Sequence, residues 1–438
     1  MNKYKILALC DDCRGVSGVG VQARFLFEGL IKTGRYSFSA LGGAIKHENY
    51  DLAVISENLT ILPVDGFGTK EQVRQILITE RPDAIFIFTD PRQFTWLWEM
   101  EDEINQICPI AYWTIWDNDP TPTFNKVWYD STDLLNCISW KTYEMLKELC
   151  PETTNYIPHA FPKHIYFPIP KDQLQAMKGE HFKEKTDWFK VLWVNRNATR
   201  KMPNDILDSW KNFLEDLQAT QGHKNAVLIM HTDPGDPEGP NLIAVTELLG
   251  IQQNVWFSTQ KVDFIYMNIL HNLVDCCVNI AKAEGFSLSS LSSLQVGKPV
   301  ISLKTGGLTR QVIDWRDGSV HGVAIEPAER SLIGSQLVPF LYEDIVDKKA
   351  LTEAFMTMHN MSQEDREKLG QKCVDYVDFE FNYDQMIQNW DRTLSETINT
   401  WRTNKPKQFQ LIELGKPQPP PRPTLSKINQ PKQRKVKQ

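Results

Sequence analysis

The sequence predicts an α/β protein with two domains, each built on a parallel β-sheet covered by helices. Apolar segments of strand length alternate with helical periodicities along most of the chain, and turns containing glycine separate many of them. A proline-dense segment, residues 156–170, interrupts this alternation, and the same rhythm resumes after it. A chain of 438 residues is long enough for two domains of ordinary size.

The first half of the chain opens with a strand, a glycine loop and a helix. Residues 5–10 show a strand pattern, and the following loop has glycines at positions 15, 18 and 20. The next helix carries its apolar residues on one face and ends at Gly34. This opening is typical of nucleotide-binding α/β domains. Later expected elements are a helix at 70–80, a strand at 84–88, a helical stretch up to 105, strands at 110–116 and 134–138, and a helix after Trp140.

The second half repeats the alternation after the proline-dense segment, where we place the hinge. We expect a first domain at residues 1–165 and a second at 166–380. The expected elements of the second domain are strands at 191–194, 226–231, 255–257 and 276–280, and helices at 204–219 and 241–249.

Composition places the chain among water-soluble globular proteins, with 41% hydrophobic and 24% charged residues. No apolar run approaches the roughly 20 residues that span a bilayer, and the apolar run after Lys5 is too short for a signal peptide. We therefore expect no membrane span and a cytoplasmic location. The eight cysteines are scattered without a disulfide or zinc spacing, which indicates reduced thiols.

The net charge of −7 is unevenly distributed along the chain. Residues 402–438 contain ten Lys or Arg and one acidic residue, together with many Pro and Gln. Such a basic, proline-rich segment is not expected to pack with an acidic body, so we predict a disordered tail. Basic tails can also attract nucleic acid.

The stretch from Ala281 to Leu308 is the most informative part of the sequence. An acidic residue and a glycine precede a serine-rich helix start, and a glycine stop, a short strand and a Gly-Gly turn follow. A carboxylate among the free N–H groups of a helix start, close to such a turn, suits a ligand that carries both hydroxyl and phosphate groups.

This stretch resembles the donor-sugar signature of retaining, nucleotide-sugar-dependent glycosyltransferases of the GT-B type, in the large family four that includes glycogen-synthase-like enzymes. The matching residues are Glu284, Gly285, Phe286, Gly297, Pro299, Val300, Gly306 and Gly307. Ser287 stands where the family has a glycine, and Ser292 stands where it has a second glutamate that grips the ribose. The resemblance implies two Rossmann-like domains facing across a cleft, with a last helix, residues 381–401, that crosses back to the first domain.

A second motif fits the same family. Arg196 and Lys201 follow the first strand of the second domain at the spacing that the family uses. Two cations there suit the diphosphate of a nucleotide sugar, because they neutralise charge that grows on the leaving group. By the family's pattern Glu284 holds sugar hydroxyls, and we name these three residues as the catalytic candidates. The alternative for this loop is a solvated basic turn.

Further residues are candidates for donor binding. Gly18 and Gly20 belong to the loop that faces the donor across the cleft in this fold, although any tight turn could use them. His231 ends a strand and is either near the nucleotide or an ordinary strand-end histidine. The remaining candidates lie in the signature stretch: Gly285, Phe286, Ser287, Leu288 and Ser292.

The acceptor side is assigned to the first domain. Trp116 and Asp117 stand where many family members have a histidine-aspartate pair. Trp96 and Trp116, with Asp90, lie beside strand ends and could form a stacking surface for a sugar or a base. Asp117 and Asp119 also make an Asp-x-Asp, which binds metal in another glycosyltransferase fold but before a proline is usually a turn. We assign no metal site.

We therefore expect a hexosyl- or pentosyltransferase that moves a sugar from a nucleotide-diphosphate sugar to an acceptor, retaining and without a metal. The resemblance implies no cofactor; the nucleotide sugar is a co-substrate. One alternative keeps this chemistry with a modified base in DNA as the acceptor, reached through the basic tail. Another is a sugar-nucleotide-binding protein without turnover, suggested by Ser292 and the missing histidine.

Overall fold

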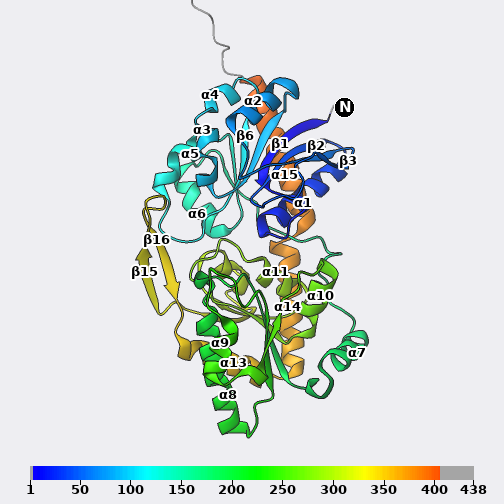
Figure 1. Ribbon diagram of the computed structural model, residues 1–438, viewed down its shortest axis with the longest axis vertical. Helices are drawn as coiled ribbons and strands as arrows, with labels where there is room; N and C mark the ends of the chain where they lie inside the picture. Colours follow the sequence, from blue (N-terminus) through cyan, green and yellow to red (C-terminus); the bar gives the residue numbers. More distant parts are fainter. Residues whose placement is uncertain (1–2, 405–438) are drawn as a thin grey trace, which may run out of the picture.

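The computed structural model of the protein describes residues 3–404, which form two α/β domains stacked along the long axis (Figure 1). The basic residues 405–438 lie outside this description, so the expectation of a disordered tail is not addressed. Among residues 3–404, no helix combines the length and the apolarity that a membrane crossing requires. The same residues contain no group of three or more His, Cys, Asp or Glu side chains arranged to hold a metal ion.

The first domain contains an eight-stranded sheet in the order β3-β4-β2-β1-β5-β6-β7-β8. All pairings are parallel except that of β3 with β4. The strands are β1 Tyr4–Asp11, β2 Tyr36–Gly43, β3 Ala53–Ser56, β4 Leu59–Pro63, β5 Ala84–Thr89, β6 Ile110–Thr114, β7 Leu134–Cys137 and β8 Thr154–Tyr156. Strand order reverses at β1 and β5, so the carboxyl ends of these strands flank the crevice where ligands bind in such sheets.

Helices cover both faces of this sheet because its strands are apolar on both sides. Helix α1 and the last helix, α15, cover one face, and α2 to α6 cover the other. The helical segments are α1 Gly18–Lys32, α2 Lys70–Thr79, η1 Pro91–Phe94, α3 Thr95–Trp98, α4 Glu101–Ile104, η2 Thr123–Asn125, α5 Lys126–Asp130 and α6 Trp140–Leu149.

The second domain contains a six-stranded parallel sheet in the order β11-β10-β9-β12-β13-β14. Its strands are β9 Phe189–Val194, β10 Ala226–His231, β11 Val255–Ser258, β12 Cys276–Asn279, β13 Val300–Leu303 and β14 Gly322–Ile325. Its helical segments are α7 Lys171–Phe182, η3 Lys183–Lys185, η4 Thr199–Lys201, α8 Pro203–Gln221, α9 Leu242–Leu249, η5 Gln252–Asn254, α10 Phe264–Leu273, α11 Leu288–Gln295, η6 Gly306–Leu308, α12 Thr309–Val312, α13 Lys348–Asn360 and α14 Gln363–Glu380.

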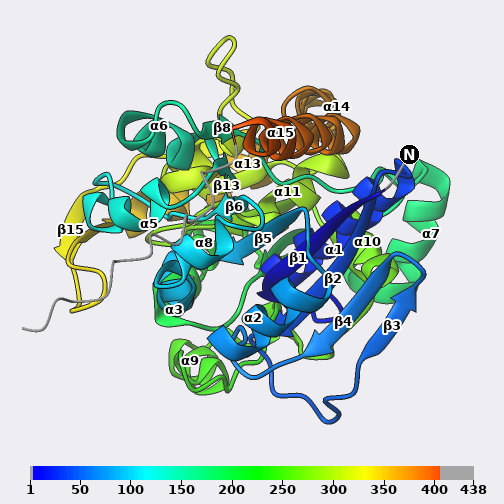
Figure 2. The same cartoon turned by 90° about the horizontal axis from the view of Figure 1, so that it is seen from above.

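The last helix, α15 Tyr383–Thr403, returns to the first domain and lies along its sheet (Figures 1 and 2). The hydroxyl of Tyr383 donates a hydrogen bond to the carbonyl oxygen of Phe25 (2.7 Å). Trp390 is fully buried against Phe86 and Trp113 of the first sheet. One apolar core therefore extends from the first domain through α15 into α11 and α14 of the second.

A β-hairpin that the sequence analysis did not anticipate projects from the second domain beside the first (Figure 1). It consists of β15 Glu329–Ile333 and β16 Leu341–Ile345, paired antiparallel. Arg330 binds the Asp119 carboxylate (3.0 Å), and the Asn118 side chain donates to the carboxylate of Asp344 (2.7 Å). Val338 and Leu341 pack against the apolar core of the first domain. The hairpin thus ties the second domain to the loop that follows β6.

Candidate active site

The carboxyl ends of the two sheets face each other, and three loops meet there. Asp117 follows β6 in the first domain, Glu284 follows β12 in the second, and Gly306 follows β13. A Cβ atom at Gly306 would overlap the carbonyl oxygens of both Asp117 and Glu284. The close backbone approach therefore requires glycine at position 306, where φ is also positive (+45°).

Glu284 forms an ion pair with Lys201, one of the two cations expected from the sequence. The two side chains are only 13% and 8% exposed. Lys201 ends η4 directly before α8, and the backbone N–H of Lys282 donates to the carbonyl oxygen of Arg200 (2.9 Å), which ties the two loops together. The Arg200 guanidinium reaches the carbonyl oxygen of Ala283 (3.3 Å). Two neighbouring cations therefore accompany the buried carboxylate.

The carboxyl groups of Glu284 and Asp117 have opposite pKa shifts. Burial would raise the pKa of Glu284, but the charges of Lys201 and Arg200 outweigh it and hold the pKa below its usual value. Burial raises the pKa of Asp117, and the negative charge of Glu284 adds to this effect against the opposing charge of Arg200. The cleft thus brings together two carboxyl groups whose pKa values are shifted in opposite directions.

The signature loop is held in shape by side chains around Ser287. Ser287 has a positive φ (+76°), a conformation that glycine adopts more easily, and its position is the one where the family has glycine. The Asn279 side chain donates to the Ser287 hydroxyl (2.8 Å), and that hydroxyl accepts from the backbone N–H of Ser290 to cap α11. Gln311 donates to the carbonyl oxygen of Phe286 (2.6 Å). This bonding offsets the cost of the strained serine.

The two predicted glycines of the first domain have different surroundings. A Cβ atom at Gly18 would lie 3.3 Å from the Leu288 side chain, so this residue lies against the start of α11. A Cβ atom at Gly20 would lie 2.6 Å from the carbonyl oxygen of Asp12, so Gly20 is needed for close packing within its own loop. The Phe286 ring is buried between His159 and Phe381, in the core between the domains. Gly18 and Leu288 thus bring the start of α1 in the first domain against the start of α11 in the second.

Three predicted donor residues are already engaged in the structure. Arg196 is 58% exposed and binds Asp236 (2.7 Å) and Glu238 (2.9 Å), not Glu284. The Ser292 hydroxyl donates to the carbonyl oxygen of Leu288 within its own helix (3.0 Å). His231 shares a hydrogen bond with Ser258 (2.9 Å), and burial lowers the pKa of the imidazole.

Gly285, predicted for donor binding, lies against Asp117, predicted for the acceptor side, since a Cβ atom at Gly285 would lie 2.9 Å from a carboxylate oxygen of Asp117. Asp90 caps η1 and pairs with Arg92, and Trp96 is partly buried against the core. Trp116 is 5% exposed. Its ring packs into the core against Phe124, so little of it is available as a stacking surface.

The Asp-x-Asp pattern has a different use in this structure. The Asp119 carboxylate binds Lys141 (2.7 Å) and Arg330 (3.0 Å), so it contributes to the contact with the hairpin. Sequence reasoning missed Arg200, Asn279 and Gln311, which complete the site. The position of Arg200 next to Lys201 in the sequence could have indicated its role. Nothing in the sequence points to Asn279 or Gln311.

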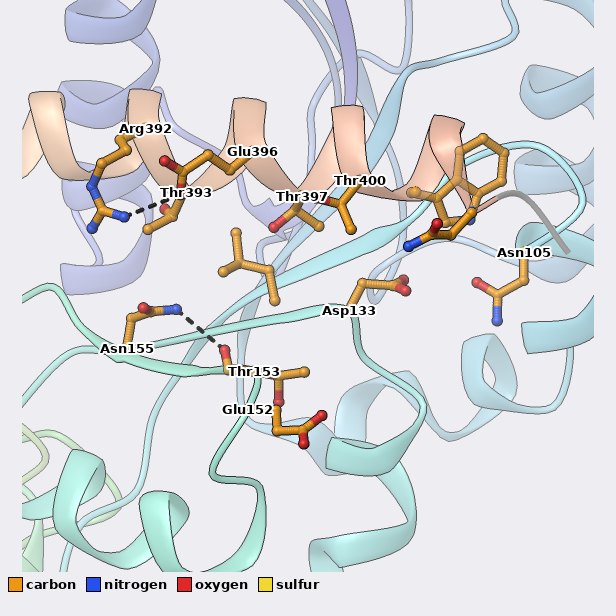
Figure 3. Close-up of a pocket in the computed structure, with 13 residues that line it drawn as sticks. Asn105, Asp133, Glu152, Thr153, Asn155, Arg392, Thr393, Glu396, Thr397 and Thr400 are labelled. Atoms are coloured by element: carbon orange, nitrogen blue, oxygen red, sulfur yellow. Dashed lines mark hydrogen bonds and ion pairs between the residues drawn. The ribbon is translucent and has the colours of Figure 1, made fainter.

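A separate polar cavity of about 480 Å³ lies between the first sheet and α15 (Figure 3). Asp133 precedes β7 and Thr153 precedes β8, so this cavity lies at the amino ends of the strands. Its facing side is formed by α15 residues such as Arg392 and Thr400. Ligands of open α/β sheets bind at the opposite, carboxyl end, where Asp117 and Glu284 lie.

No protein-family model and no curated protein matches this sequence, but solved structures resemble it. A sucrose-phosphate synthase from Thermosynechococcus elongatus is 14% identical, with 91% of this chain and 100% of that chain covered and a TM-score of 0.70. HepE from Anabaena in complex with UDP and glucose is 14% identical, with 90% and 100% covered and a TM-score of 0.64. The catalytic domain of starch synthase IV from Arabidopsis thaliana, bound to ADP and acarbose, is 10% identical, with 91% and 100% covered and a TM-score of 0.61. The GT-B fold expected from the signature stretch is confirmed.

Proposed function

We propose that the protein is a glycosyltransferase that transfers a sugar from a nucleotide-diphosphate sugar to an acceptor hydroxyl. The observation that carries the proposal is the Glu284–Lys201 pair, placed in a GT-B cleft and opposed by Asp117 from the other domain. The structural neighbour HepE, whose structure contains UDP and glucose, supports the choice of donor class.

In the proposed reaction the acceptor oxygen forms a bond to the anomeric carbon while the bond from that carbon to the diphosphate breaks. The acceptor proton passes to the departing diphosphate. Lys201 stabilises the charge that grows on the diphosphate, and Glu284 binds sugar hydroxyls and favours the positive charge that develops on the sugar. We propose retention of configuration and no metal requirement, on the resemblance of the signature stretch.

Arg196 can bind the diphosphate in the proposed reaction only if it leaves its present ion-pair partners. Its guanidinium is exposed and bound to Asp236 and Glu238, and an exposed ion pair of this kind is weak enough to exchange. A diphosphate in the cleft would offer a stronger, doubly charged partner. We therefore expect Arg196→Ala to lower turnover by about 10²–10³ with little change in thermal stability.

The test combines binding with product formation. A thermal-shift panel of UDP, GDP, ADP and CMP sugars identifies the donor, because a ligand at 100 times its Kd adds about 2.7 kcal/mol of stability. Mass spectrometry then measures release of the nucleotide and transfer of the sugar by the wild type, by Glu284→Gln and by Glu247→Gln. Glu247 is an exposed glutamate of α9 and is the matched control.

We expect donor binding in all three proteins and turnover in the wild type and the control alone. Absence of binding to every nucleotide sugar would refute the proposal. Binding without release or transfer would favour the alternative of a binding protein without turnover. A modified DNA base as acceptor depends on the basic tail, which lies largely outside the described residues.

A further inference from the structure

An open cavity of about 750 Å³ in the first domain belongs to none of the roles assigned above. It lies at the carboxyl ends of β1, β2, β4 and β5, on the edge of the sheet where strand order reverses. The lining residues are Asp11, Ala44, Ile45, Lys46, Tyr50, Asp65, Gly66, Phe67, Thr89 and Gln93.

This cavity is linked to the candidate active site by two short connections along the chain. Thr89 lines it, and the next residue, Asp90, is one of the charges that act on Asp117. Asp11 lines it as well and accepts a hydrogen bond from Ser17 (2.6 Å), the residue that caps α1 directly before Gly18. Because Gly18 lies against Leu288, the N-terminus of α1 connects the lining of this cavity to the second domain.

The cavity is built on a fixed backbone. The backbone N–H of Ala44 donates to the carbonyl oxygen of Gly66 (2.9 Å), which joins the end of β2 to the loop after β4. A Cβ atom at Gly43 would overlap that same oxygen, so the two chain segments are in direct contact. The Tyr50 hydroxyl donates to the Asp65 carboxylate (2.6 Å), which orients both side chains at the rim.

The charges of the lining do not suit an anion. Two carboxylates, Asp11 and Asp65, face a single cation, the exposed Lys46. The nearby Arg14 is held by the carboxylate of Asp12 (2.6 Å). A phosphate group is normally bound by convergent cations or N–H groups, and carboxylates repel it.

The same lining suits a neutral compound with many hydroxyl groups. Carboxylates accept hydrogen bonds from hydroxyls, and Thr89 and Gln93 can both donate and accept. Tyr50 is 43% exposed, so part of its ring is available to the C–H face of a sugar.

We propose that this cavity binds the acceptor of the transfer and that the acceptor is an uncharged polyhydroxylated compound, a saccharide, not a sugar phosphate or a nucleic acid. The identification of the bound compound as the acceptor rests on the proposed function. The binding preference itself can be measured without turnover.

The experiment uses saturation-transfer NMR on the full chain with neutral mono- and disaccharides, their phosphate esters and single-stranded DNA. The variants are Asp65→Asn, Tyr50→Ala and Lys46→Ala, with Asp51→Asn as the control. Asp51 is an exposed aspartate next to Tyr50 that does not line the cavity. Circular dichroism checks that each variant folds, and UDP binding in the same samples tests the donor side independently.

We expect a neutral saccharide to bind, and Asp65→Asn and Tyr50→Ala to weaken that binding by at least tenfold. Lys46→Ala and Asp51→Asn should leave it unchanged, and UDP binding should be the same in all samples. Binding of phosphate esters or DNA in preference to neutral saccharides would overturn the proposal. So would saccharide binding that is insensitive to Asp65 and Tyr50. Loss of UDP binding alone would count against the proposed function and not against this cavity.

Discussion

The loops carrying Glu284 and Asp117 meet in one cleft but are stabilised in different ways. The Glu284 loop is fixed from within the second domain, by the pair with Lys201 and by the bonds that Asn279 and Gln311 make around Ser287. The Asp117 loop is held from both domains, because Asp119 pairs with Lys141 of the first domain and the hairpin β15–β16 of the second domain binds Asn118 and Asp119. The Glu284 loop is therefore ordered by one domain, whereas the Asp117 loop also depends on how the two domains are joined.

The largest effect is expected from removing the cation that pairs with Glu284. Lys201→Met leaves Glu284 nearly buried without its ion-pair partner, which should cost about 3–5 kcal/mol of unfolding free energy. The double variant with Glu284→Gln should recover much of this stability, since no buried charge is then unpaired. Urea denaturation measures both. If the single and double variants were equally destabilised, the pair would have no special role in holding this loop.

A second variant tests whether the two loops need their close contact. Gly306→Ala should cost about 1–3 kcal/mol, because the added Cβ meets the backbone of both Asp117 and Glu284. Gly318→Ala is the control, since Gly318 has a positive φ (+76°) but open space around its Cβ position. If Gly306→Ala loses more unfolding free energy than the control, the excess is due to the contact between the two loops and not to backbone strain. Equal losses would show that the loops can move apart freely.

The opposite pKa shifts predict opposite dependences of stability on pH. The raised pKa of Asp117 gives a contribution that is present below the ordinary value of 3.8 and is lost as pH rises through the folded-state pKa. The lowered pKa of Glu284 gives one that is present above 4.5 and is lost as pH falls through the folded-state pKa. Asp117→Asn should therefore gain stability relative to wild type as pH rises, and Glu284→Gln should lose it. Urea denaturation at a series of pH values around 3.8 and 4.5 measures both dependences. If the stability of both variants relative to wild type changed in the same direction as pH rises, the opposite pKa shifts would be contradicted.

The smallest effect is expected from loosening the hairpin. Arg330→Ala removes the ion pairs with Asp119 and Asp344, and because the arginine is 43% exposed and Asn118 still donates to the buried Asp344 carboxylate, the loss should be about 1 kcal/mol or less. Hydrogen exchange of residues 117–124 should nevertheless become faster, while exchange of residues 284–290 stays unchanged. Lys349→Ala, which breaks an exposed pair on α13, is the control. Faster exchange in both loops would contradict the view that they are held separately.

Much of the architecture could be predicted from local patterns. The strands that begin near residues 5, 84 and 226 are continuous apolar runs, and buried parallel strands require such runs. The hairpin was missed because both of its strands are largely solvent-exposed and polar, so they lack the apolar pattern of buried strands. The first-domain strands β2 to β4 were missed as well, since β2 and β4 alternate buried with half-buried residues and β3 is only four residues long and largely exposed.

The sequence by itself determined the two α/β domains, because periodicity is a local property of the chain, and Glu284 and Lys201 were marked by the resemblance of their motifs to a known family. Only the tertiary structure decided which groups meet. It placed Asp117 close to Glu284, paired Arg196 with Asp236 and Glu238, and buried Trp116. These outcomes depend on contacts between residues that are far apart in sequence. No single segment contains the charges and neighbours that fix a side chain's position or its pKa.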